Sequence, residues 1–238
     1  MPTIVFASPK GGSGKSTSAV LLATQLAVKG AEVTILDADA NKPVSHWAKL
    51  PGKPDNLTVI ASISENTIID DIETAAQKTP FVVVDLEGTA SMMVAYAISR
   101  ADLVIIPTQG SQLDASQAAK AISLIKQQEK AFSKKIPYSV LFTRTSAAIK
   151  PRTLLHIQQE FHKHGIQSFR TQINEREAYR ALFSFGGTLE GLNPEHVTNL
   201  EAAIINARAF VAELIFILKQ PHPQTSTQKR TQPLEVVL

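Results

Sequence analysis

The sequence predicts an α/β fold of three layers, in which a mostly parallel, twisted sheet carries helices on both faces. Apolar runs such as Thr3–Ala7, Leu57–Ala61 and Phe81–Val84 alternate along the chain with longer segments of helical periodicity. The run Phe81–Val84 is apolar at every position, as expected of a strand buried on both faces of a parallel sheet. Asp37 and Asp85 directly follow two such runs, at the strand ends where parallel sheets bind ligands.

The individual elements follow in chain order. Gly30 ends the first helix, Pro43 lies near the start of a short second one, and Pro107 ends a strand. Gly186 and Gly187 end a later helix. We expect strands at 3–7, 32–37, 57–61, 81–85, 101–107, 137–143 and 167–173, and helices at 19–27, 41–49, 65–77, 113–131, 176–185 and 194–220. A further helix follows the sixth strand, carries His156 and ends near His164.

Composition limits the class of protein. The chain has 238 residues, of which 44% are hydrophobic and 19% charged, which suits one globular domain. No apolar run approaches membrane-spanning length, and the start lacks a signal-peptide pattern. The absence of cysteine excludes disulfides and Fe–S ligation by this chain. We expect a cytoplasmic protein with a single domain over residues 1–220 and a disordered tail over 221–238, where Pro, Gln, Thr and Ser dominate.

The segment Pro9–Thr17 is the clearest chemical signal. It lies between an apolar strand and a helix, and Gly-Lys-Ser at that junction predicts a phosphate-binding loop. Its backbone N–H groups and the helix N-terminus would face phosphate oxygens. Lys15 would reach the β- and γ-phosphates, and the Ser16 hydroxyl would ligate Mg²⁺. The expected nucleotide-binding residues of the loop are Lys10, Gly11, Gly12, Ser13, Gly14, Lys15, Ser16 and Thr17.

A second lysine distinguishes this loop. Pro9 stands where the common motif has its first glycine, and Lys10 opens the run Lys-Gly-Gly-x-Gly-Lys-Ser-Thr. This resembles the deviant Walker A motif of the ParA/MinD family of P-loop ATPases. The resemblance implies a P-loop NTPase fold, ATP and Mg²⁺ as cofactors, and a homodimer in which Lys10 crosses to the partner's ATP. The alternative is a glycine-rich turn that merely needs positive φ angles.

The same resemblance implies roles for Asp37, Asp39 and Asp85, the carboxylates at the strand ends. Side-chain alternation puts Asp37 and Asp39 on one side of the departing chain. The resemblance implies that Asp39 orients the attacking water, so that Lys10, Lys15 and Asp39 form the catalytic set. Asp37 would help to hold the Mg²⁺ shell or Lys10. Phe81–Asp85 has the Walker B form, so Asp85 would hold Mg²⁺. The expected metal residues are therefore Ser16, Asp37 and Asp85. The alternative is that the two aspartates after the second strand only form a turn.

The resemblance covers about residues 3–218. The stretch Ala101–Asp114 is similar to a segment of ParA-type proteins, and Asp114 is expected to be structural or to make a dimer contact. Thr143 and Arg144 lie where the family reads the adenine base, commonly with Asn-Arg. The run from Asp37 to Trp47 is similar to the VirC-type branch of the family, which assists conjugative DNA transfer. Gly88 would be the glycine that senses the γ-phosphate.

A basic segment suggests a polyanionic partner. Residues 120–180 hold 12 Lys or Arg against four acids, whereas the remainder holds 12 against 17. Such a block on an otherwise acidic chain is typical of binding to a phosphate backbone, although a solvated helix face is the common alternative. Arg176 and Arg180, four apart on a helix, would share a face. The expected DNA-binding residues are Lys150, Arg152, Arg170, Arg176 and Arg180.

The resulting hypothesis is a ParA-type ATPase. An ATP-sandwich dimer would bind DNA without sequence preference, associate with the nucleoid, and drive partition or positioning of plasmid, chromosomal or conjugative DNA through hydrolysis. Its partner would be a centromere-binding or relaxosome adaptor protein, and no stable membrane association is expected. Two alternatives remain: a MinD-like membrane-cycling ATPase that uses its last helix, and a ligase-type metabolic enzyme on the same fold.

Overall fold

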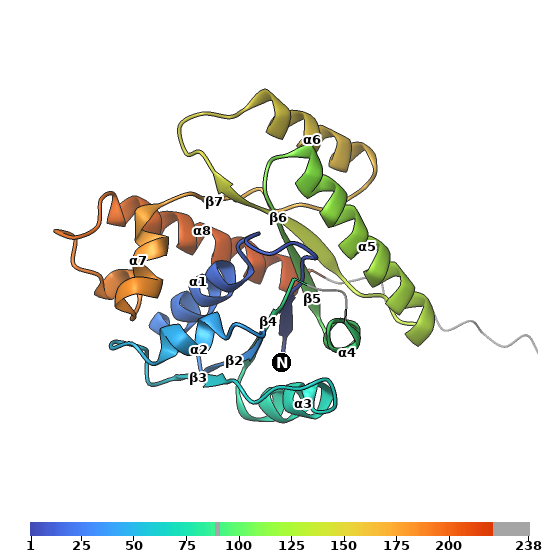
Figure 1. Ribbon diagram of the computed structural model, residues 1–238, viewed down its shortest axis with the longest axis horizontal. Coiled ribbons are helices and arrows are strands. Elements are labelled where there is room, and N and C mark those ends of the chain that lie inside the picture. Colours follow the sequence, from blue (N-terminus) through green and yellow to red (C-terminus); the bar gives the residue numbers. More distant parts are fainter. Residues whose placement is uncertain (89–90, 221–238) are drawn as a thin grey trace, which may run out of the picture.

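The computed structural model describes residues 1–88 and 91–220, so the tail expected at 221–238 lies outside the described residues. Its strands form a single seven-stranded sheet, with helices on either side (Figure 1). The strands are β1 Thr3–Phe6, β2 Val33–Ala38, β3 Leu57–Ile60, β4 Phe81–Leu86, β5 Leu103–Thr108, β6 Tyr138–Thr145 and β7 Ile173–Asn174. The helices are α1 Lys15–Val28, α2 Pro43–Ala48, α3 Ile68–Lys78, α4 Met92–Ser99, α5 Gln112–Phe132, α6 Arg152–Lys163, α7 Glu177–Phe185 and α8 Leu200–Lys219, with a 3-10 turn η1 Leu189–Gly191.

The sheet confirms the predicted three-layer fold. Its order is β3-β2-β4-β1-β5-β6-β7, and every pairing between the named strands is parallel. β1 therefore lies centrally, between β4 and β5. Because parallel strands end at the same edge of a sheet, the segments after β1, β2, β4, β5 and β6 converge there. The continuous apolar strands account for the arrangement, since helices cover the sheet on both faces.

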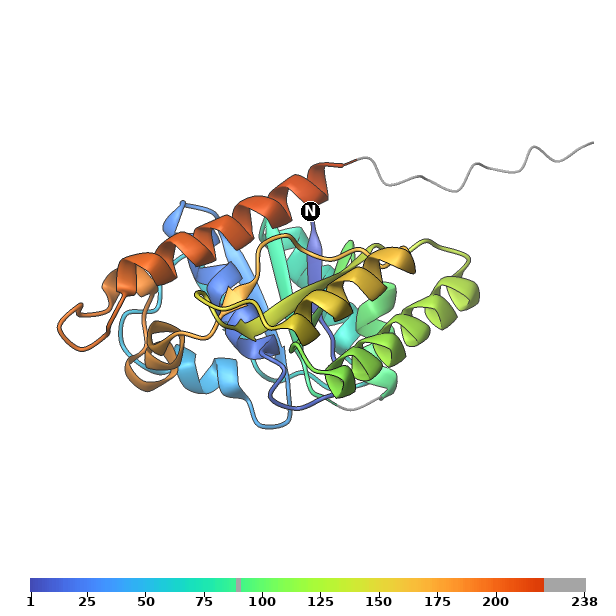
Figure 2. The same ribbon diagram turned by 90° about the horizontal axis from the view of Figure 1, so that it is seen from above.

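Two hydrophobic cores fill the space between the layers. On one face, α1, α2, α7 and α8 pack against the sheet around the fully buried side chains Phe6, Trp47 and Phe210. On the other face, α3, α4, α5 and α6 pack around Phe142 and Ile157. Figures 1 and 2 show the long helix α8 on the first side of the sheet and α5 on the second. In the described part of the chain, no helix combines the length and apolar character needed to cross a membrane.

The strand predicted at 167–173 is wrong over most of its length. Ser168 makes one isolated bridge to Val140, and regular pairing with β6 is confined to β7. The physical reason is a competing acceptor on α8. The carboxylate of Glu213 accepts the backbone N–H groups of Arg170, at 2.7 Å, and of Thr171, at 2.8 Å. These N–H groups are thereby bound to a helix side chain and not to a neighbouring strand.

Several helix predictions also need correction. The first helix begins at Lys15 and not at residue 19. The last helix begins at Leu200 and not near residue 194, because Asn193 binds the N–H of Glu195 and Asn199 adopts a left-handed conformation with φ of 53°. Such Asn turns compete with helix formation. The third helix begins at Ile68 and not at residue 65. The short helix α4 was not predicted at all.

Gly186 fixes the junction between α7 and the loop after α2. Its φ is 82°, in the region that favours glycine. A Cβ atom there would lie 2.5 Å from the Leu50 Cβ and 2.6 Å from the Pro51 carbonyl oxygen. The neighbouring Gly187 carbonyl accepts a hydrogen bond of 3.2 Å from the Trp47 indole. The backbone at this junction therefore lies too close to the α2 loop to admit a side chain.

We expect Gly186→Ala to destabilise the fold more than Gly30→Ala does. Gly30 has a similar φ of 88°, but a Cβ atom there would meet no described atom within 4 Å. Gly30→Ala should therefore cost only the left-handed backbone term, about 1 kcal/mol, and Gly186→Ala about 1–3 kcal/mol more through overpacking. Urea unfolding of the two variants measures the difference. Equal losses would show that the α7 junction is not tightly packed.

Candidate functional site

The glycine-rich loop between β1 and α1 lies at the convergent edge of the sheet. Gly12 and Gly14 have φ of 73° and 94°, which bends the backbone in a way that only glycine adopts readily. Gly14 caps α1 without a side-chain hydrogen bond, so the first N–H groups of the helix are available to a ligand. The buried Lys15 side chain donates to the carbonyl of Lys10 at 3.2 Å. Burial lowers the pKa of the Lys15 ammonium, and nearby carboxylates, Asp85 first among them, oppose this shift.

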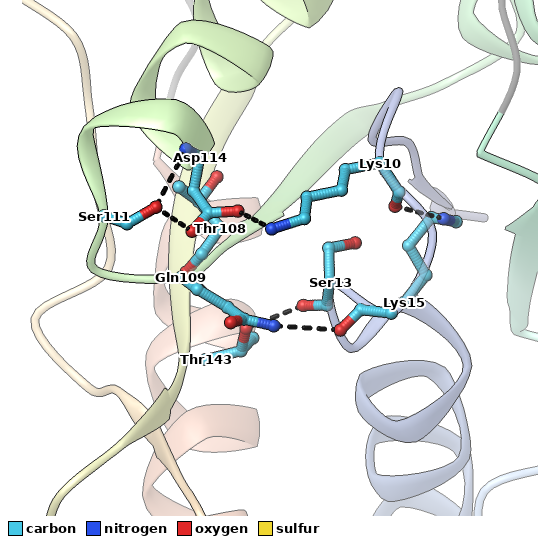
Figure 3. A network of polar contacts seen from close by, with 9 residues as sticks. Lys10, Ser13, Lys15, Thr108, Gln109, Ser111, Asp114 and Thr143 are labelled. Atoms are coloured by element: carbon cyan, nitrogen blue, oxygen red, sulfur yellow. Dashed lines mark hydrogen bonds and ion pairs between the residues drawn. The ribbon is translucent and has the colours of Figure 1, made fainter.

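Two strand ends hold the far side of this loop (Figure 3). The side-chain amide of Gln109, just after β5, donates to the Gly12 carbonyl at 3.0 Å. The hydroxyl of Thr143, on β6, donates to the Ser13 carbonyl at 2.6 Å. Thr143 is only 2% exposed, and a Cβ atom on Gly14 would lie 3.3 Å from its side chain. Thr143, which the resemblance places near the adenine base, thus also contacts the glycine loop.

Lys10 is held within its own chain. Its ammonium lies 2.6 Å from the Oδ1 atom of Asp114, near the start of α5, and the Ser111 hydroxyl bonds the other carboxylate oxygen of Asp114 (Figure 3). Partial burial favours the neutral acid, but the bonds from Lys10 and Ser111 prevail and hold the pKa of Asp114 below its ordinary value. Asp114 thus makes the contacts within its own chain that the expected structural role requires.

Two buried carboxylates lie side by side behind the loop. Asp37 on β2 and Asp85 on β4 are paired in register, and both residues are 0% exposed. The Oδ2 atom of Asp37 accepts the N–H of Ser45 at 2.7 Å and its hydroxyl at 2.6 Å. Within the described residues, the Oδ1 atom of Asp37 and both oxygens of Asp85 lack a partner of hydrogen-bond geometry.

Burial raises the pKa of Asp85 to about 7, and the adjacent Asp37 adds to the rise. The Ser16 hydroxyl and the Lys15 ammonium lie close enough to oppose it. Carboxyl groups with a strongly shifted pKa are common in ligand-binding sites, and Asp85 lies in a polar site beside the glycine loop. Its uncompensated oxygens match the hard-oxygen donor set that Mg²⁺ prefers.

A cleft of about 410 Å³ opens in front of these groups. Asp39 lies at its wall, and its Oδ1 atom accepts the N–H of Asn41 at 2.8 Å. Gly88 approaches the loop so closely that a Cβ atom on it would lie 2.9 Å from the Gly11 nitrogen. The cleft is lined by Gly11, Gly12, Gly14, Lys15, Ser16, Thr17, Asp39, Asn41, Glu87, Gly88 and Arg144.

A second cleft, of about 280 Å³, continues from the loop along α7. Gly14, Thr17 and Arg144 line both clefts, so the two are adjacent. The outer wall of the second includes Asn174, Glu175, Arg176, Tyr179 and Arg180. Asn174 was not among the sequence candidates, because nothing in its local pattern separates it from any strand-end Asn.

The predicted DNA-binding residues do not form one group. Arg176 and Arg180 line the second cleft, and Arg176 precedes the first residue of α7, so the two do not share a helix face as predicted. Arg180 pairs with Glu175 at 3.0 Å and with Glu177 at 2.8 Å. The other three candidates are exposed and do not line this cleft: Lys150 just before α6, Arg152 at its first residue, and Arg170 on the segment before β7.

The chain resembles known proteins over most of its length. The family model of VirC1 proteins matches residues 1–217. ParA from Rhizobium radiobacter is 43% identical over 210 residues, which are 88% of this chain and 94% of that protein. A virC1 protein from Rhizobium rhizogenes is 25% identical over 228 residues, covering 92% and 96%. Apo McdA from Cyanothece superposes with a TM-score of 0.70 at 17% identity, covering 87% of this chain and 99% of that one.

The parallel sheet with its two-lysine glycine loop, together with the 43% identity to ParA, identifies a P-loop protein of the ParA/MinD type. More narrowly, the family match and the identity to ParA show that the chain belongs to the VirC1 family. The predicted family, its VirC-like branch and the predicted fold are therefore confirmed.

Asp85 and Asp114, the two carboxyl groups whose pKa values are shifted, should give the stability of the fold opposite dependences on pH. The raised pKa of Asp85 means that the folded protein retains a proton that the unfolded chain releases above pH 3.8, so stability falls as the pH rises towards about 7. Asp85→Asn should thus stabilise the nucleotide-free protein above pH 7, by at most about 4 kcal/mol, and less at pH 5.

Asp114→Asn provides the contrast. In wild type, the lowered pKa of the Asp114 carboxyl contributes stability at neutral pH, and this stability is lost on acidification. The variant should therefore be less stable than wild type at pH 8 and approach it in acid. Urea unfolding without divalent cations measures both. A destabilising Asp85→Asn at pH 8 would contradict the burial argument.

Proposed function

We propose that this protein is an ATP-dependent switch that dimerises around ATP, binds DNA without sequence preference, and is released by hydrolysis. The observation that carries the proposal is the juxtaposition of the buried Lys15, the exposed Lys10 and the uncompensated Asp85 around one glycine loop. Relatives named ParA and virC1 support the family context. McdA, which has this fold, has been solved as an ATP complex.

The polar groups divide into a phosphate side and a metal side. The loop N–H groups and Lys15 would bind the phosphates. Ser16, Asp85 and the free oxygen of Asp37 would hold Mg²⁺, which, when bound, neutralises phosphate charge. Ser45 occupies the other oxygen of Asp37, so Asp37 would contribute to the water shell of the Mg²⁺ with one oxygen only. Asp39 would orient a water at the cleft wall, where Asn41 fixes its Oδ1 atom. Thr17 and Arg144 would contact the nucleotide where the two clefts meet.

Dimerisation and DNA binding rest on exposed cations. The Lys10 side chain is 43% exposed, so it can leave Asp114 and bind the phosphates of the ATP held by a partner subunit. Lys150, Arg152 and Arg170 are exposed and suit a phosphate backbone. Arg176 and Arg180 contribute to the nucleotide side in this proposal, because they line the cleft that continues from the loop. Two aligned subunits would double the DNA contacts and bring an adaptor protein to the DNA.

ATP should control DNA binding by the purified protein. We expect binding with ATP and Mg²⁺ and much less with ADP or no nucleotide, and the ATP-dependent affinity should fall steeply with salt because phosphate contacts release counterions. Lys15→Gln should weaken ATP binding by roughly 10- to 100-fold, since a charged donor is lost, and should abolish the ATP effect on DNA.

The matched control is Lys29→Gln, the same substitution on the exposed end of α1; it should behave as wild type. Fluorescence anisotropy of labelled duplex DNA across a salt series provides the measurement. If DNA binding is absent in every nucleotide state, the DNA part of the proposal is wrong. ATP-dependent binding to liposomes would then favour the MinD-like alternative, for which the exposed Phe216 near the end of α8 is the relevant feature.

Lys10 should be needed for the dimer and not for ATP. Lys10→Ala should retain ATP binding within about threefold yet remain monomeric with ATP, because the lysine serves the partner's phosphates. Asp114→Asn breaks the same ion pair but keeps Lys10, so it should still dimerise. Analytical ultracentrifugation with a non-hydrolysable ATP analogue measures both. A normal ATP dimer of Lys10→Ala would show that Lys10 does not serve the partner's ATP.

A further inference from the structure

The phosphate loop has two carbonyl groups that are held from outside it. Gly12 accepts from the Gln109 amide at 3.0 Å, and Ser13 accepts from the Thr143 hydroxyl at 2.6 Å (Figure 3). The two donors come from the ends of neighbouring strands, β5 and β6, which pair in parallel. A loop rich in glycine has little conformational preference of its own. Its shape therefore depends on contacts of this kind.

Peptide geometry turns these contacts into a control of direction. A trans peptide is planar, and its C=O and N–H point to opposite sides. The described residues contain no cis peptide bond. Holding the Gly12 carbonyl therefore directs the N–H of Ser13 away from Gln109, and holding the Ser13 carbonyl directs the N–H of Gly14 away from Thr143. Backbone N–H groups of such loops are what bind anions.

Thr143 is suited to this task by its stiffness. It is β-branched, which restricts its χ1 angle, and it is 2% exposed near the carboxyl end of β6. A Cβ atom placed on Gly14 would lie 3.3 Å from the Thr143 Cβ and Cγ2 atoms, so the two residues are in close contact. The Thr143 hydroxyl is within reach of one further acceptor, the Thr108 carbonyl at 3.5 Å. Thr143 also lines the second cleft, but both acceptors of its hydroxyl are backbone carbonyls of the site.

The geometry points to Gln109 and Thr143 as positioning residues that fix the Ser13 and Gly14 N–H groups for phosphate, an inference that rests on the proposed nucleotide function. It replaces the adenine-reading role that the sequence suggested for Thr143. The two roles differ in a measurable way. A positioning residue changes the affinity for every nucleoside triphosphate by the same factor, whereas a residue that reads the base changes the preference between bases.

The test measures dissociation constants for ATP and GTP by calorimetry, and melting temperatures without nucleotide. Thr143→Val keeps the shape and removes the hydroxyl, and it should weaken both nucleotides by roughly tenfold, the effect of about one lost buried hydrogen bond. Thr143→Ser restores the donor and should recover most of the affinity. Gln109→Leu removes the other donor at a half-buried position, where the fold is not at risk, and should weaken both nucleotides by about threefold.

Thr34→Val is the matched control. Thr34 is 3% exposed on β2, and its hydroxyl accepts a hydrogen bond of 3.0 Å from Thr79, remote from the loop. It should lose stability without losing nucleotide affinity. A purely structural role for Thr143 predicts the same behaviour as Thr34.

The outcomes separate cleanly. Parallel losses for ATP and GTP with an unchanged ratio, together with recovery in Thr143→Ser, support the inference. Unchanged affinities in Thr143→Val and Gln109→Leu, or a shifted ATP to GTP ratio, overturn it while leaving the nucleotide function intact. Should Thr143→Val fail to fold, Gln109→Leu decides alone. If wild type binds neither nucleotide, the proposed function and this inference fall together.

Discussion

The rest of the site depends on one constraint: charged groups must be kept in a buried place without being fully neutralised. Lys15, Asp37 and Asp85 are all inside the protein, and the two carboxylates have oxygens without a hydrogen-bond partner among the described residues. Burying uncompensated charge is costly. A site that retains this cost is prepared for a ligand that supplies the missing charge, and Mg²⁺ with phosphates has that composition. The raised pKa of Asp85 is the physical expression of the same constraint.

The parallel sheet is what makes the cost tolerable. Asp37 and Asp85 each lie on a strand that is buried on both faces, so their positions are set by backbone hydrogen bonds and core packing and not by the charge interactions themselves. The loop, by contrast, is rich in glycine, and its shape depends on contacts with neighbouring residues. Lys15 holds it from within, Gln109 and Thr143 from the strand ends, and the Lys10–Asp114 pair from α5. The β5–α5 junction thus contacts the loop twice.

Local patterns predicted what depends on local chemistry. The Gly-Lys-Ser junction after an apolar strand indicated the phosphate loop, and the continuous run before Asp85 indicated a buried parallel strand with a carboxylate at its end. Predictions failed where a distant side chain competed with the backbone. Glu213 on α8 occupies the N–H groups of residues 170 and 171, which ended the expected strand. The turns at Asn193 and Asn199 shift the start of the last helix to Leu200.

The sequence by itself determined the class of the protein, its sheet of parallel strands, and which residue types surround the phosphate loop, because these follow from periodicity and from motifs of adjacent residues. Only the tertiary structure decided the partners. Lys10 faces Asp114, 104 residues away, and Thr143 faces Ser13, 130 residues away. It also placed Arg176 and Arg180 on the second cleft, beside the glycine loop, and not on a shared helix face. Such pairings are fixed by the order of strands in the sheet, which no local pattern encodes.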